Sequence, residues 1–487
     1  MTTTNSHIEQ EHPDFTAKAR MWRRYRDLYA GGEQFRANAS EYLLRRQKEP
    51  VEVYQERLAR VFYENYLGSI VDWYTATLVR REPVLEFAGT NERGKDFFAR
   101  FVQNCDLRGT TLTQFFKQQI TEALVCGKSY VVVDFPRTDS PALTRADEDA
   151  SGRSRAYLVA YSADEVINWS TDQQGELEWV VIRTSWLKQD SVKTFGWKRE
   201  TKWIYYDREK FEIYERRGSD QIRPDQNGAD QKTIVLVDQG SHGFAGIGRV
   251  PVFELKVSEG LWLTNKIALL QLEHFNKSNA LGWALTMGLF AMPVIYSDKE
   301  FNQITGESYY IQLGPEDRFG WTEPGGNVFQ IAAENLGRLK DEIYRVSYVM
   351  QQAGDGSGAP QSGLSQQWDF SVTQEILRAY GDIVKDSIRN VLGAIVAARQ
   401  DGLAVDAVGL DEFDITDFAT EVSDATSLLK LGIQSPTLTK QIQKRVALKY
   451  LCDVRQEIKN KIAGEIDAAV GAVAAPDKQG VQEEKKL

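Results

Sequence analysis

The sequence has few of the residues from which catalytic and metal-binding sites are built. Among 487 residues there are 3 cysteines and 4 histidines. Cys105, Cys126 and Cys452 are odd in number, widely spaced and form no CxxC pair, which predicts reduced thiols in a cytosolic protein. No two histidines have metal-ligand spacing. GxSxG is also absent, so no nucleophile elbow is predicted. The histidines are His7, His12, His242 and His274.

The chain also lacks an excess of positive charge. Its net charge is −10 and its pI is near 5.3, which argues against a general affinity of the whole chain for nucleic acid or anionic membranes. The acidic charge does not exclude a function as a channel through which DNA passes, because tight binding to DNA would hinder passage there. Acidic residues are abundant without a spacing that singles out a catalytic pair. The sequence also does not exclude a polymerase or nuclease with scattered catalytic carboxylates, since such residues are distant in the sequence and come together only when the chain folds.

Targeting segments are not evident. The N-terminal segment MTTTNSHIEQEHPD is polar and acidic, which does not resemble a signal peptide. Residues 278–297 carry no charge and have the length of a membrane span. This run contains Asn279 and Pro293, lies alone in mid-chain and has no basic flank. We therefore favour a buried helix that runs into a strand after Met292, with a membrane span as the alternative.

The rest of the composition is that of a globular protein. Hydrophobic residues make up 42% and charged residues 26% of the chain, and the length predicts two to four structural units. Periodicity changes along the chain. Residues 156–254 alternate with period two and predict five or more antiparallel strands. The remainder is mostly helical in period, which gives an α+β fold class.

Several helices are predicted from apolar spacing and capping residues. They cover 15–29, 51–79, 106–126 and 261–290. Strands and turns are predicted over 293–329, in the segments VIYSD, SYYIQL and VFQIA, the last of which is 328–332. Thr111 and Gln114 have capping-box spacing, and Ser435 with Pro436 opens a final helix that continues past Lys461. Residues 1–14 and 465–487 are predicted to be disordered, and an acidic linker follows Gly402. The cluster Arg20, Arg23, Arg24 and Arg26 predicts either a solvated helix face, which we favour, or a surface that contacts phosphates or a partner.

A helix, a glycine-rich loop and a second helix are predicted over residues 334–399. Five apolar residues form one stripe of the first helix: Leu336, Leu339, Ile343, Val346 and Met350. The next residues, AGDGSGAPQSG, contain too much glycine for a regular element. Ser371 and Gln374 have capping-box spacing and predict the start of the following helix. The loop is longer than a helical hairpin needs, so it is either an ordinary exposed connection or a loop with a function.

Residues 127–134, GKSYVVVD, are similar to the two parts of a nucleotide site. A nucleotide-hydrolysing packaging enzyme would use Lys128 and Asp134 for phosphate and metal. A phosphate loop needs a glycine five residues before Gly127, where this chain has Glu122. It also needs the order strand, loop, helix, whereas here the order is helix, GKS, strand. We favour Gly127 as a helix C-cap followed by a buried strand, and keep the enzyme as the alternative.

A series of short motifs runs in order through the first 185 residues. It consists of His12-Pro13, Trp22, Arg26-Asp27, Gly31-Gly32, Glu41-Tyr42-Leu43, Tyr54 with Arg57, Asn65-Tyr66, Arg81-Glu82-Pro83, Gly127-Lys128 with VVVDFPR, and AYLVAYSADEVINW ending at Trp169. With this series the chain resembles the portal proteins of tailed bacteriophages, the head-to-tail connectors that begin with a His-Pro motif. The resemblance is looser to about residue 400 and weak beyond it, and Leu44 stands where relatives often have proline.

The resemblance implies a structural protein and not an enzyme. Portal proteins form a ring, usually a dodecamer, at one capsid vertex, and double-stranded DNA is packaged and ejected through the ring without sequence specificity. The implied partners are the terminase large subunit, the head-tail adaptor, the major capsid protein and a scaffold protein, with no cofactor, metal or membrane. The implied location is the virion, and the host cytoplasm during assembly.

The resemblance also implies a division of the chain and a set of site residues. The parts are an N-terminal arm and helix (1–40), a wing (41–258), a first stem helix (259–290), a clip (291–332), a second stem helix (333–352), a tunnel loop (353–365), a long helix with a crown (366–464) and a disordered tail (465–487). The tunnel loop would meet DNA through Gly354, Asp355, Gly356, Ser357, Gly358, Gln361 and Ser362. The clip would dock partners through Asp298, Lys299, Glu300, Glu316, Asp317 and Arg318.

Three cations of the second stem helix are further candidates. Arg338, Lys340 and Arg345 could form rings of positive charge near the DNA. Ordinary ion pairing with Asp341 and Glu342 along the helix is the alternative. The sequence leaves open which of the three faces inward.

Overall fold

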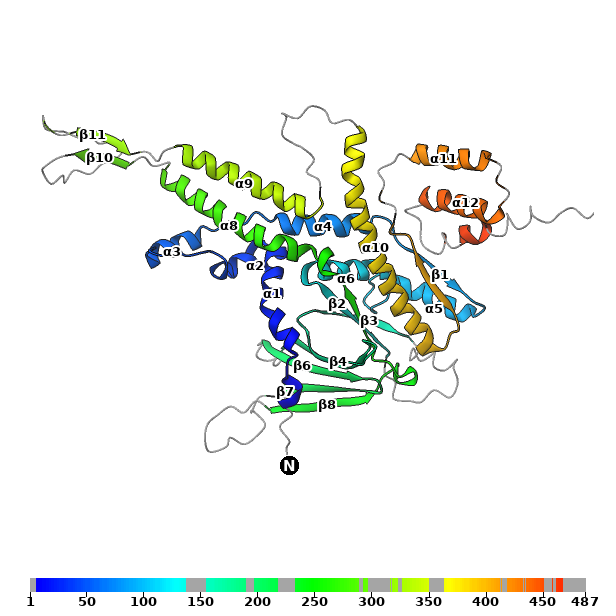
Figure 1. Ribbon diagram of the computed structural model, residues 1–487. Helices are drawn as coiled ribbons and strands as arrows, with labels where there is room; N and C mark the ends of the chain where they lie inside the picture. Colours follow the sequence, from blue (N-terminus) through cyan, green and yellow to red (C-terminus); the bar gives the residue numbers. More distant parts are fainter. Residues whose placement is uncertain are drawn as a thin grey trace, which may run out of the picture. The chain divides into compact units, whose positions relative to one another are not determined.

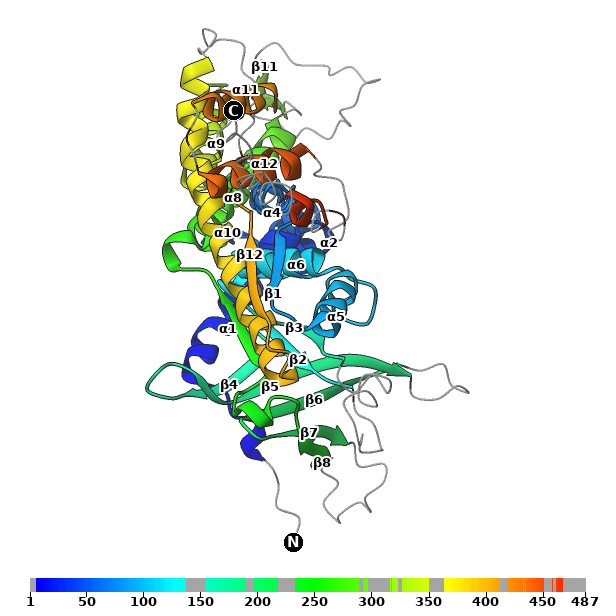
Figure 2. The same ribbon diagram turned by 90° about the vertical axis from the view of Figure 1, so that its right-hand side faces the viewer.

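The fold is α+β, as the sequence predicts (Figures 1 and 2). The computed structural model describes residues 6–136, 155–189, 197–217, 233–288, 292–296, 316, 318–322, 326–349, 363–411, 413, 418–431, 433, 435–450, 458 and 461–466. The chain divides into two compact units. Unit 1 contains residues 1–22, 72–262 and 363–487, and unit 2 contains residues 23–71 and 263–362. Each unit is therefore assembled from segments that are distant in the sequence.

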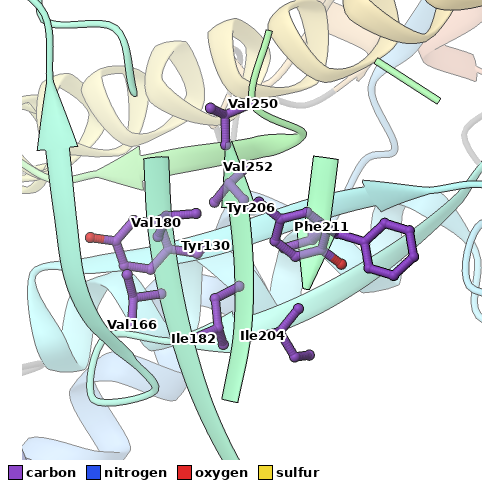
Figure 3. Close-up of a cluster of buried hydrophobic side chains, with 10 residues drawn as sticks. Tyr130, Val166, Val180, Ile182, Ile204, Tyr206, Phe211, Val250 and Val252 are labelled. Atoms are coloured by element: carbon purple, nitrogen blue, oxygen red, sulfur yellow. The ribbon is translucent and has the colours of Figure 1, made fainter. Parts of the chain in front are cut away.

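The core of unit 1 lies between two antiparallel sheets. The larger sheet has the order β4 (Val166–Thr171), β5 (Leu177–Gln189), β6 (Trp197–Asp207), β7 (Lys210–Arg217) and β8 (Thr233–Ser241). The smaller sheet has the order β3 (Tyr157–Ser162), β2 (Lys128–Asp134) and β9 (Val252–Lys256). Alternate side chains of both sheets meet in one apolar cluster, which includes Tyr130, Val180, Ile182 and Phe211 (Figure 3). This confirms the strands predicted from period two.

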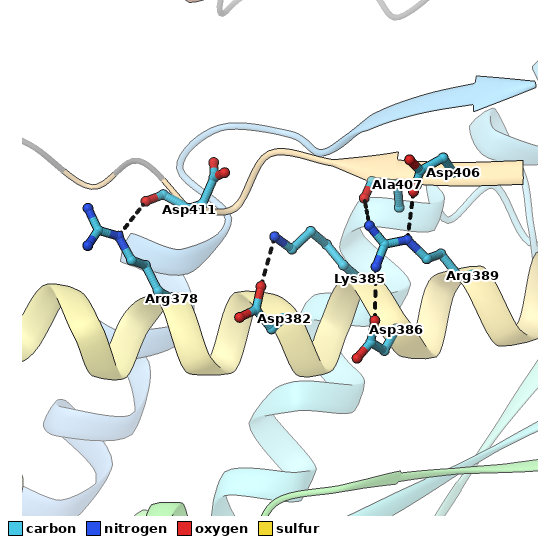
Figure 4. Close-up of polar contacts among 8 residues, drawn as sticks. All are labelled: Arg378, Asp382, Lys385, Asp386, Arg389, Asp406, Ala407 and Asp411. Carbon is cyan, nitrogen blue, oxygen red and sulfur yellow. Dashed lines mark hydrogen bonds and ion pairs between the residues drawn. The ribbon is translucent and has the colours of Figure 1, made fainter.

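Helices and a strand pair complete unit 1. The helices are α5 (Glu92–Gln103), α6 (Leu112–Cys126), α10 (Gly363–Arg399), α11 (Phe418–Lys430) and α12 (Pro436–Tyr450), and β1 (Val84–Ala88) pairs with β12 (Ala404–Val408). Polar contacts join α10 to β12 and the residues after it. The Arg389 guanidinium donates to Asp406 at 2.7 Å and to the Ala407 carbonyl at 2.8 Å, and Arg378 donates to the Asp411 carbonyl at 3.0 Å (Figure 4).

Unit 2 is organised around a long helix. Helix α8 (Leu263–Gly288) packs against α9 (Gly326–Val346), and the short hairpin of β10 (Met292–Tyr296) and β11 (Arg318–Thr322) lies at one end of this pair (Figure 1). Helices α2 (Gly32–Ala37) and α3 (Val51–Ala59) belong to the same unit. Helices α1 (Pro13–Ala30) and α4 (Tyr66–Leu78) contribute residues to both units.

The continuous helix predicted over residues 51–79 is wrong. The chain leaves helical geometry after Ala59 and α4 begins at Tyr66. The Asn65 side chain accepts a hydrogen bond from the Gly68 amide at 2.8 Å. An asparagine that satisfies a free amide of the first turn is a strong N-cap, and it starts a new helix here.

The helix predicted over 106–126 also begins later, at Leu112. The Asp106 carboxylate accepts bonds from the Arg108 amide at 2.8 Å and the Thr110 amide at 3.1 Å, and this local turn competes with a helix. The Thr111 cap is confirmed, because its hydroxyl accepts a bond from the Gln114 amide at 3.3 Å. The Ser435 cap is confirmed in the same way by the Leu438 amide.

Three further predictions differ from the structure. The strand expected within 328–332 is the first part of α9, because Phe329, Ala332 and Leu336 also fit a helical stripe. Helix α10 begins at Gly363 and not at Ser371, so 363–365 are helical and the capping-box spacing is a coincidence inside the helix. Residues 6–14 are ordered, with a short 3₁₀ helix (Ser6–Glu9) and α1 beginning at Pro13. Strands β1 and β12 and helices α5 and α11 were not predicted.

Candidate functional site

Motif residues of the first 185 residues form one cluster in each unit, and the first of these lies at the N-terminal arm in unit 1. The His12 amide donates to the Ile167 carbonyl at 2.8 Å, and its ring stacks on Trp169 with a centroid distance of 4.1 Å. The Lys128 ammonium lies 4.5 Å from the centre of the same Trp169 ring. Trp22 donates from its indole to the Cys126 carbonyl at 2.8 Å. These residues therefore hold the arm, α6 and the sheets together.

Lys128 is placed in a site that disfavours its charge. Its ammonium donates to the Tyr130 hydroxyl at 2.6 Å and lies 3.4 Å from Glu254. Burial lowers the pKa of Lys128, and the Glu254 carboxylate opposes this by raising it. The Trp169 ring replaces part of the lost hydration through a cation–π contact.

The nucleotide site that would use Lys128 and Asp134 is not formed. Gly127 caps α6 in the left-handed region with φ of 83°, and Lys128 begins β2 instead of a helix. Asp134 ends the same strand, so the two residues are about 20 Å apart along β2. Asp134 accepts bonds from the Tyr157 hydroxyl and the Phe135 amide, both at 2.8 Å. The alternative function therefore has no phosphate cradle in this fold.

A second cluster of motif residues forms in unit 2. The buried Asp27 carboxylate accepts hydrogen bonds from Tyr42 at 2.6 Å, Asn38 at 3.0 Å and Gln34 at 3.1 Å. Burial, and then the bond to Asp27, raises the pKa of the Tyr42 phenol. Arg57 donates to both oxygens of the buried Glu49 at 2.8 Å. These polar groups fix the turns between α1 and α4.

The backbone conformation and the surroundings of Gly31 explain why the motif series has glycine at this position. It has φ of 60°, and a Cβ at this position would lie 2.7 Å from the Asn65 side-chain nitrogen. Asn65 uses that nitrogen to donate to the Tyr29 carbonyl at 2.8 Å. A side chain at Gly31 would displace this bond, so Gly31 and Asn65 require each other. Gly31 and Asn65 thus have an architectural part in the motif series.

Helix α8 carries a set of amides that the sequence reasoning missed. Asn279 accepts from the Phe62 amide at 3.1 Å and donates to the Phe62 carbonyl at 2.9 Å. Asn276 binds the Leu44 amide and the Tyr42 carbonyl, and Gln271 binds the Leu67 amide and the Glu64 carbonyl. Each amide holds one backbone donor and one backbone acceptor between residues 42 and 67, and we call the three the amide clamps. No local feature of the sequence distinguishes these amides from exposed ones.

The three candidate cations of α9 do not share one face. At 100° per residue, Arg338 and Arg345 lie within about 20° of each other, whereas Lys340 lies about 160° from Arg338. Lys340 lowers the pKa of His274 on α8, so it is near that helix. Arg345 donates to Glu342 at 2.7 Å, as the alternative of ion pairing within the helix predicts. Arg338 is exposed and has no ion pair among the described residues.

Most residues of the implied tunnel loop and clip lie outside the described residues. This holds for Gly354, Asp355, Gly356, Ser357, Gly358, Gln361 and Ser362, and for Asp298, Lys299, Glu300 and Asp317. Glu316 is exposed, and Arg318 begins β11 opposite Tyr296, which is itself exposed. Only one end of the implied docking surface is therefore described.

The described residues of unit 2 include two apolar patches. The first, the hairpin patch, consists of Leu285, Val328 and Ile331, of which the α9 residues are 70% and 66% exposed. Lys277 donates to Asn335 at 2.9 Å and sets the register of α8 on α9. From there eight residues forward on α8 and seven back on α9 place Leu285 and Val328 at similar heights along the helix pair. The hairpin patch therefore gathers exposed apolar side chains at the same end of both helices.

The second patch, the loop patch, consists of Leu44 and Phe62. Their exposed fractions are 68% and 44%. Asn276 and Asn279 hold the backbone of these two residues on neighbouring turns of α8. Helix α9 lies on another side of α8 (Figure 1). Among the described residues, the hairpin patch and the loop patch thus lie on different sides of α8.

The described residues contain no cluster of three or more His, Cys, Asp and Glu that could hold a metal ion. No described helix is long and apolar enough to cross a membrane, and the uncharged run starting at residue 278 begins with the buried Ser278 and Asn279 of α8. Cys105 and Cys126 are buried free thiols, and burial raises the pKa of Cys105 to about 12. Neither thiol is placed to act as a nucleophile.

Comparisons with known proteins find distant similarity of structure. No family model and no curated protein matches the sequence. One solved structure, described as the neck of an empty gene transfer agent particle computed with C6 symmetry, shares 12% identity over 76% of this chain and 87% of that chain, with a TM-score of 0.42. Another, the virion of a native gene transfer agent particle, shares 12% identity over 82% of this chain and 94% of that chain, with a TM-score of 0.38.

Proposed function

We propose that the protein is a portal protein of a phage-like particle, which forms a ring around double-stranded DNA at a capsid vertex. The observation that carries this proposal is the pair of apolar patches on unit 2. A surface that pairs with a different surface of the next copy generates a closed ring when the rotation closes. The hairpin patch and the loop patch lie on different faces of α8, which suits such head-to-tail contacts better than a two-fold dimer.

The order of the elements also supports the proposal. A long helix, a small β hairpin, a second striped helix, a glycine-rich segment and a third long helix follow one another along the chain. The motif resemblance implies the same order for stem, clip, stem, tunnel loop and crown. In the ring, the acidic whole-chain charge would limit adhesion to passing DNA. The terminase, the head-tail adaptor and the major capsid protein would dock on the outside.

The patch assignment is tested by charge placed in the hairpin patch. The double variant Val328→Glu/Ile331→Glu should stay folded because both side chains are exposed, but it should lose the ring, since the contact would bury two carboxylates. Light scattering and negative-stain images would show a particle of one 55.2 kDa chain in place of an annular assembly.

The control places the same charge on another face of the same helix, as Gln330→Glu/Ala333→Glu, and should still form rings. A wild-type protein that forms a dimer or tetramer without a central hole contradicts the portal assignment. If both double variants form rings equally well, the ring assignment stands, but the hairpin patch is not the contact between subunits.

The proposed tunnel loop has its own test. Deletion of Asp355 to Ser362 should leave ring formation intact, because the loop lies outside the proposed contacts between subunits. Particles assembled with this variant should package or retain less DNA, which is measured as DNA protected from nuclease per particle. Normal DNA packaging and retention by the deletion variant would show that this segment is not a functional tunnel loop.

A further inference from the structure

We infer that one face of the five-stranded sheet in unit 1 is a docking site for an acidic peptide segment of another protein, and that the chain's own residues 6–11 occupy it. Strand side chains alternate between the two faces of a sheet. Ile182 and Ile204 belong to the apolar cluster, so their neighbours Arg183 and Trp203 lie on the opposite face. Trp203 is 1% exposed, which shows that this second face is also covered.

Residues 6–11, here called the arm segment, lie on that second face. The segment begins as a 3₁₀ helix that contacts β6 (Figure 1). Glu11 accepts a hydrogen bond from the Arg183 guanidinium of β5 at 2.9 Å, and Glu9 accepts one from the Arg216 guanidinium of β7. Two carboxylates that lie two residues apart in the chain therefore meet two cations of the sheet. The face recognises a Glu-x-Glu segment through complementary charge.

Both cations rest on aromatic rings. The Arg183 guanidinium lies 5.6 Å from the centre of the Phe15 ring, and the Arg216 guanidinium lies 5.0 Å from the centre of the Trp203 ring. A guanidinium stacked on a ring keeps its N–H donors available for a carboxylate. Phe15 and Trp203 are buried in α1 and β6, so both rings belong to the body of unit 1 and not to the arm segment. The pair of cations is therefore a built feature of this face.

The arm segment is attached by side chains alone. Among the described residues it makes no backbone hydrogen bond to the sheet, and the first such bond along the chain runs from the His12 amide to the Ile167 carbonyl. The side chains of its two ion pairs are between 32% and 40% exposed, and ion pairs with this exposure stabilise weakly. Because α1 begins at Pro13, the arm segment can leave the sheet without unfolding the helix.

The arm segment also leaves one polar group of the face unsatisfied. The indole nitrogen of Trp203 is buried and has no hydrogen-bond partner among the described residues. A buried donor without an acceptor is unfavourable. A segment with the same two carboxylates and one further acceptor that reaches this nitrogen would bind the face better than the arm segment does. The partner is therefore an acidic segment that displaces the arm segment, which acts as a weak intramolecular competitor.

The test is the binding of an acetylated and amidated peptide, SHIEQE, to a chain that lacks residues 2–11. Broadening of the peptide's NMR signals measures weak binding of this kind to a large protein. The full chain should bind the peptide about threefold or more less tightly, because the tethered arm segment competes at a millimolar effective concentration. The peptide SHIQQQ should bind the shortened chain about fivefold less tightly, since both ion pairs are lost.

Charge reversal tests the two arginines. In the shortened chain, Arg183→Glu/Arg216→Glu should weaken SHIEQE binding by about tenfold or more, because attraction becomes repulsion. This variant should instead bind the peptide SHIKQK, and that recovery shows that its sheet is folded. The matched control Arg93→Glu/Arg100→Glu makes the same change of charge at two exposed positions of α5. It should change the affinity for SHIEQE less than about twofold, because distant exposed charges are screened.

Four results overturn the inference. Equal affinity of SHIEQE for the full and shortened chains would place the peptide outside the site of the arm segment. Equal loss in both arginine variants would assign binding to the charge of the whole chain. Absence of binding to a folded shortened chain would leave no docking site. Displacement of the peptide by a DNA duplex but not by poly-glutamate would transfer the face to nucleic acid.

A second variant keeps the test decisive if the shortened chain does not fold. Glu9→Gln/Glu11→Gln in the full chain removes both ion pairs of the arm segment without removing the segment itself. This variant should bind SHIEQE more tightly than the wild type does, because its own arm segment competes less well. An affinity equal to that of the wild type would reject the site.

Discussion

The two units bury their backbone polar groups in different ways. In unit 1 the strands satisfy one another, and the interior between the sheets is an apolar cluster that includes Val180, Ile182 and Val252. In unit 2 the stretches of chain between α2, α3 and α4 have no sheet, and the side-chain amides of α8 bind their backbone instead. Strand pairing therefore satisfies the backbone of the sheets in unit 1, whereas these stretches of unit 2 depend on single side-chain amides of α8.

The largest expected effect follows from breaking one amide clamp. Asn279→Leu keeps the size of the side chain but leaves the amide and carbonyl of Phe62 without their partner. We expect the free energy of local opening at Phe62 to fall by about 2–4 kcal/mol, because each buried unpaired group costs about 1–3 kcal/mol. Amide hydrogen exchange measures this opening residue by residue.

Two controls sharpen the comparison. Asn335→Leu removes an exposed amide that binds only Lys277 and should change exchange by less than about 0.5 kcal/mol. Ile182→Val in unit 1 removes one buried methyl group and should cost about 1 kcal/mol, spread over the sheet. An Asn279→Leu effect no larger than that of Asn335→Leu would show that water replaces the clamp.

A smaller effect on folding stability is expected from the protonation of one buried histidine in each unit. Burial lowers the pKa of His242 in unit 1 and of His274 in unit 2, although Glu64 opposes the shift at His274. Both are therefore neutral when folded, and the unfolded chain binds more protons below its pKa of about 6.5. The stabilisation is complete above that pH and is lost as the pH falls toward the folded values.

The two histidines should respond differently to substitution. His242 uses both ring nitrogens, with the Asp207 carbonyl and the Phe244 amide, whereas Nδ1 of His274 is buried without a hydrogen-bond partner among the described residues. His274→Gln should abolish the acid-dependent loss of protection in unit 2 between pH 7.5 and 5.5, at most about 1.4 kcal/mol per pH unit. Unit 1 should keep its own pH dependence. If the Leu67 amide of the His274→Gln variant keeps its acid-dependent loss of protection, that loss arises from Glu64 and not from His274.

The sequence predicts what local periodicity and local caps determine. The alternating residues of β5 to β7, the Thr111 cap of α6 and the C-cap at Gly127 were all accessible, because each signal lies within a few residues. The pairing of β1 with β12 could not be predicted from the sequence, since each strand has five residues and its partner lies more than three hundred residues away.

The candidate site was accessible only in part. The angular separation of Lys340 from Arg338 and Arg345 follows from helix geometry alone and could have been derived in advance. The clamps of α8 could not, because an asparagine on a helix reads the same whether it meets water or the backbone of Phe62. Most residues of the implied tunnel loop lie outside the described residues, so their part in the channel stays a prediction.

The division of each unit among distant segments has a consequence for synthesis on the ribosome. Residues 23–71 emerge long before α8, which supplies the amide clamps that hold their backbone. Strand β1 must wait for β12, which is made about 320 residues later. Neither unit can close as its N-terminal part appears, so apolar surface stays uncovered through most of translation, and a chaperone that shields nascent chains should raise the yield of native protein.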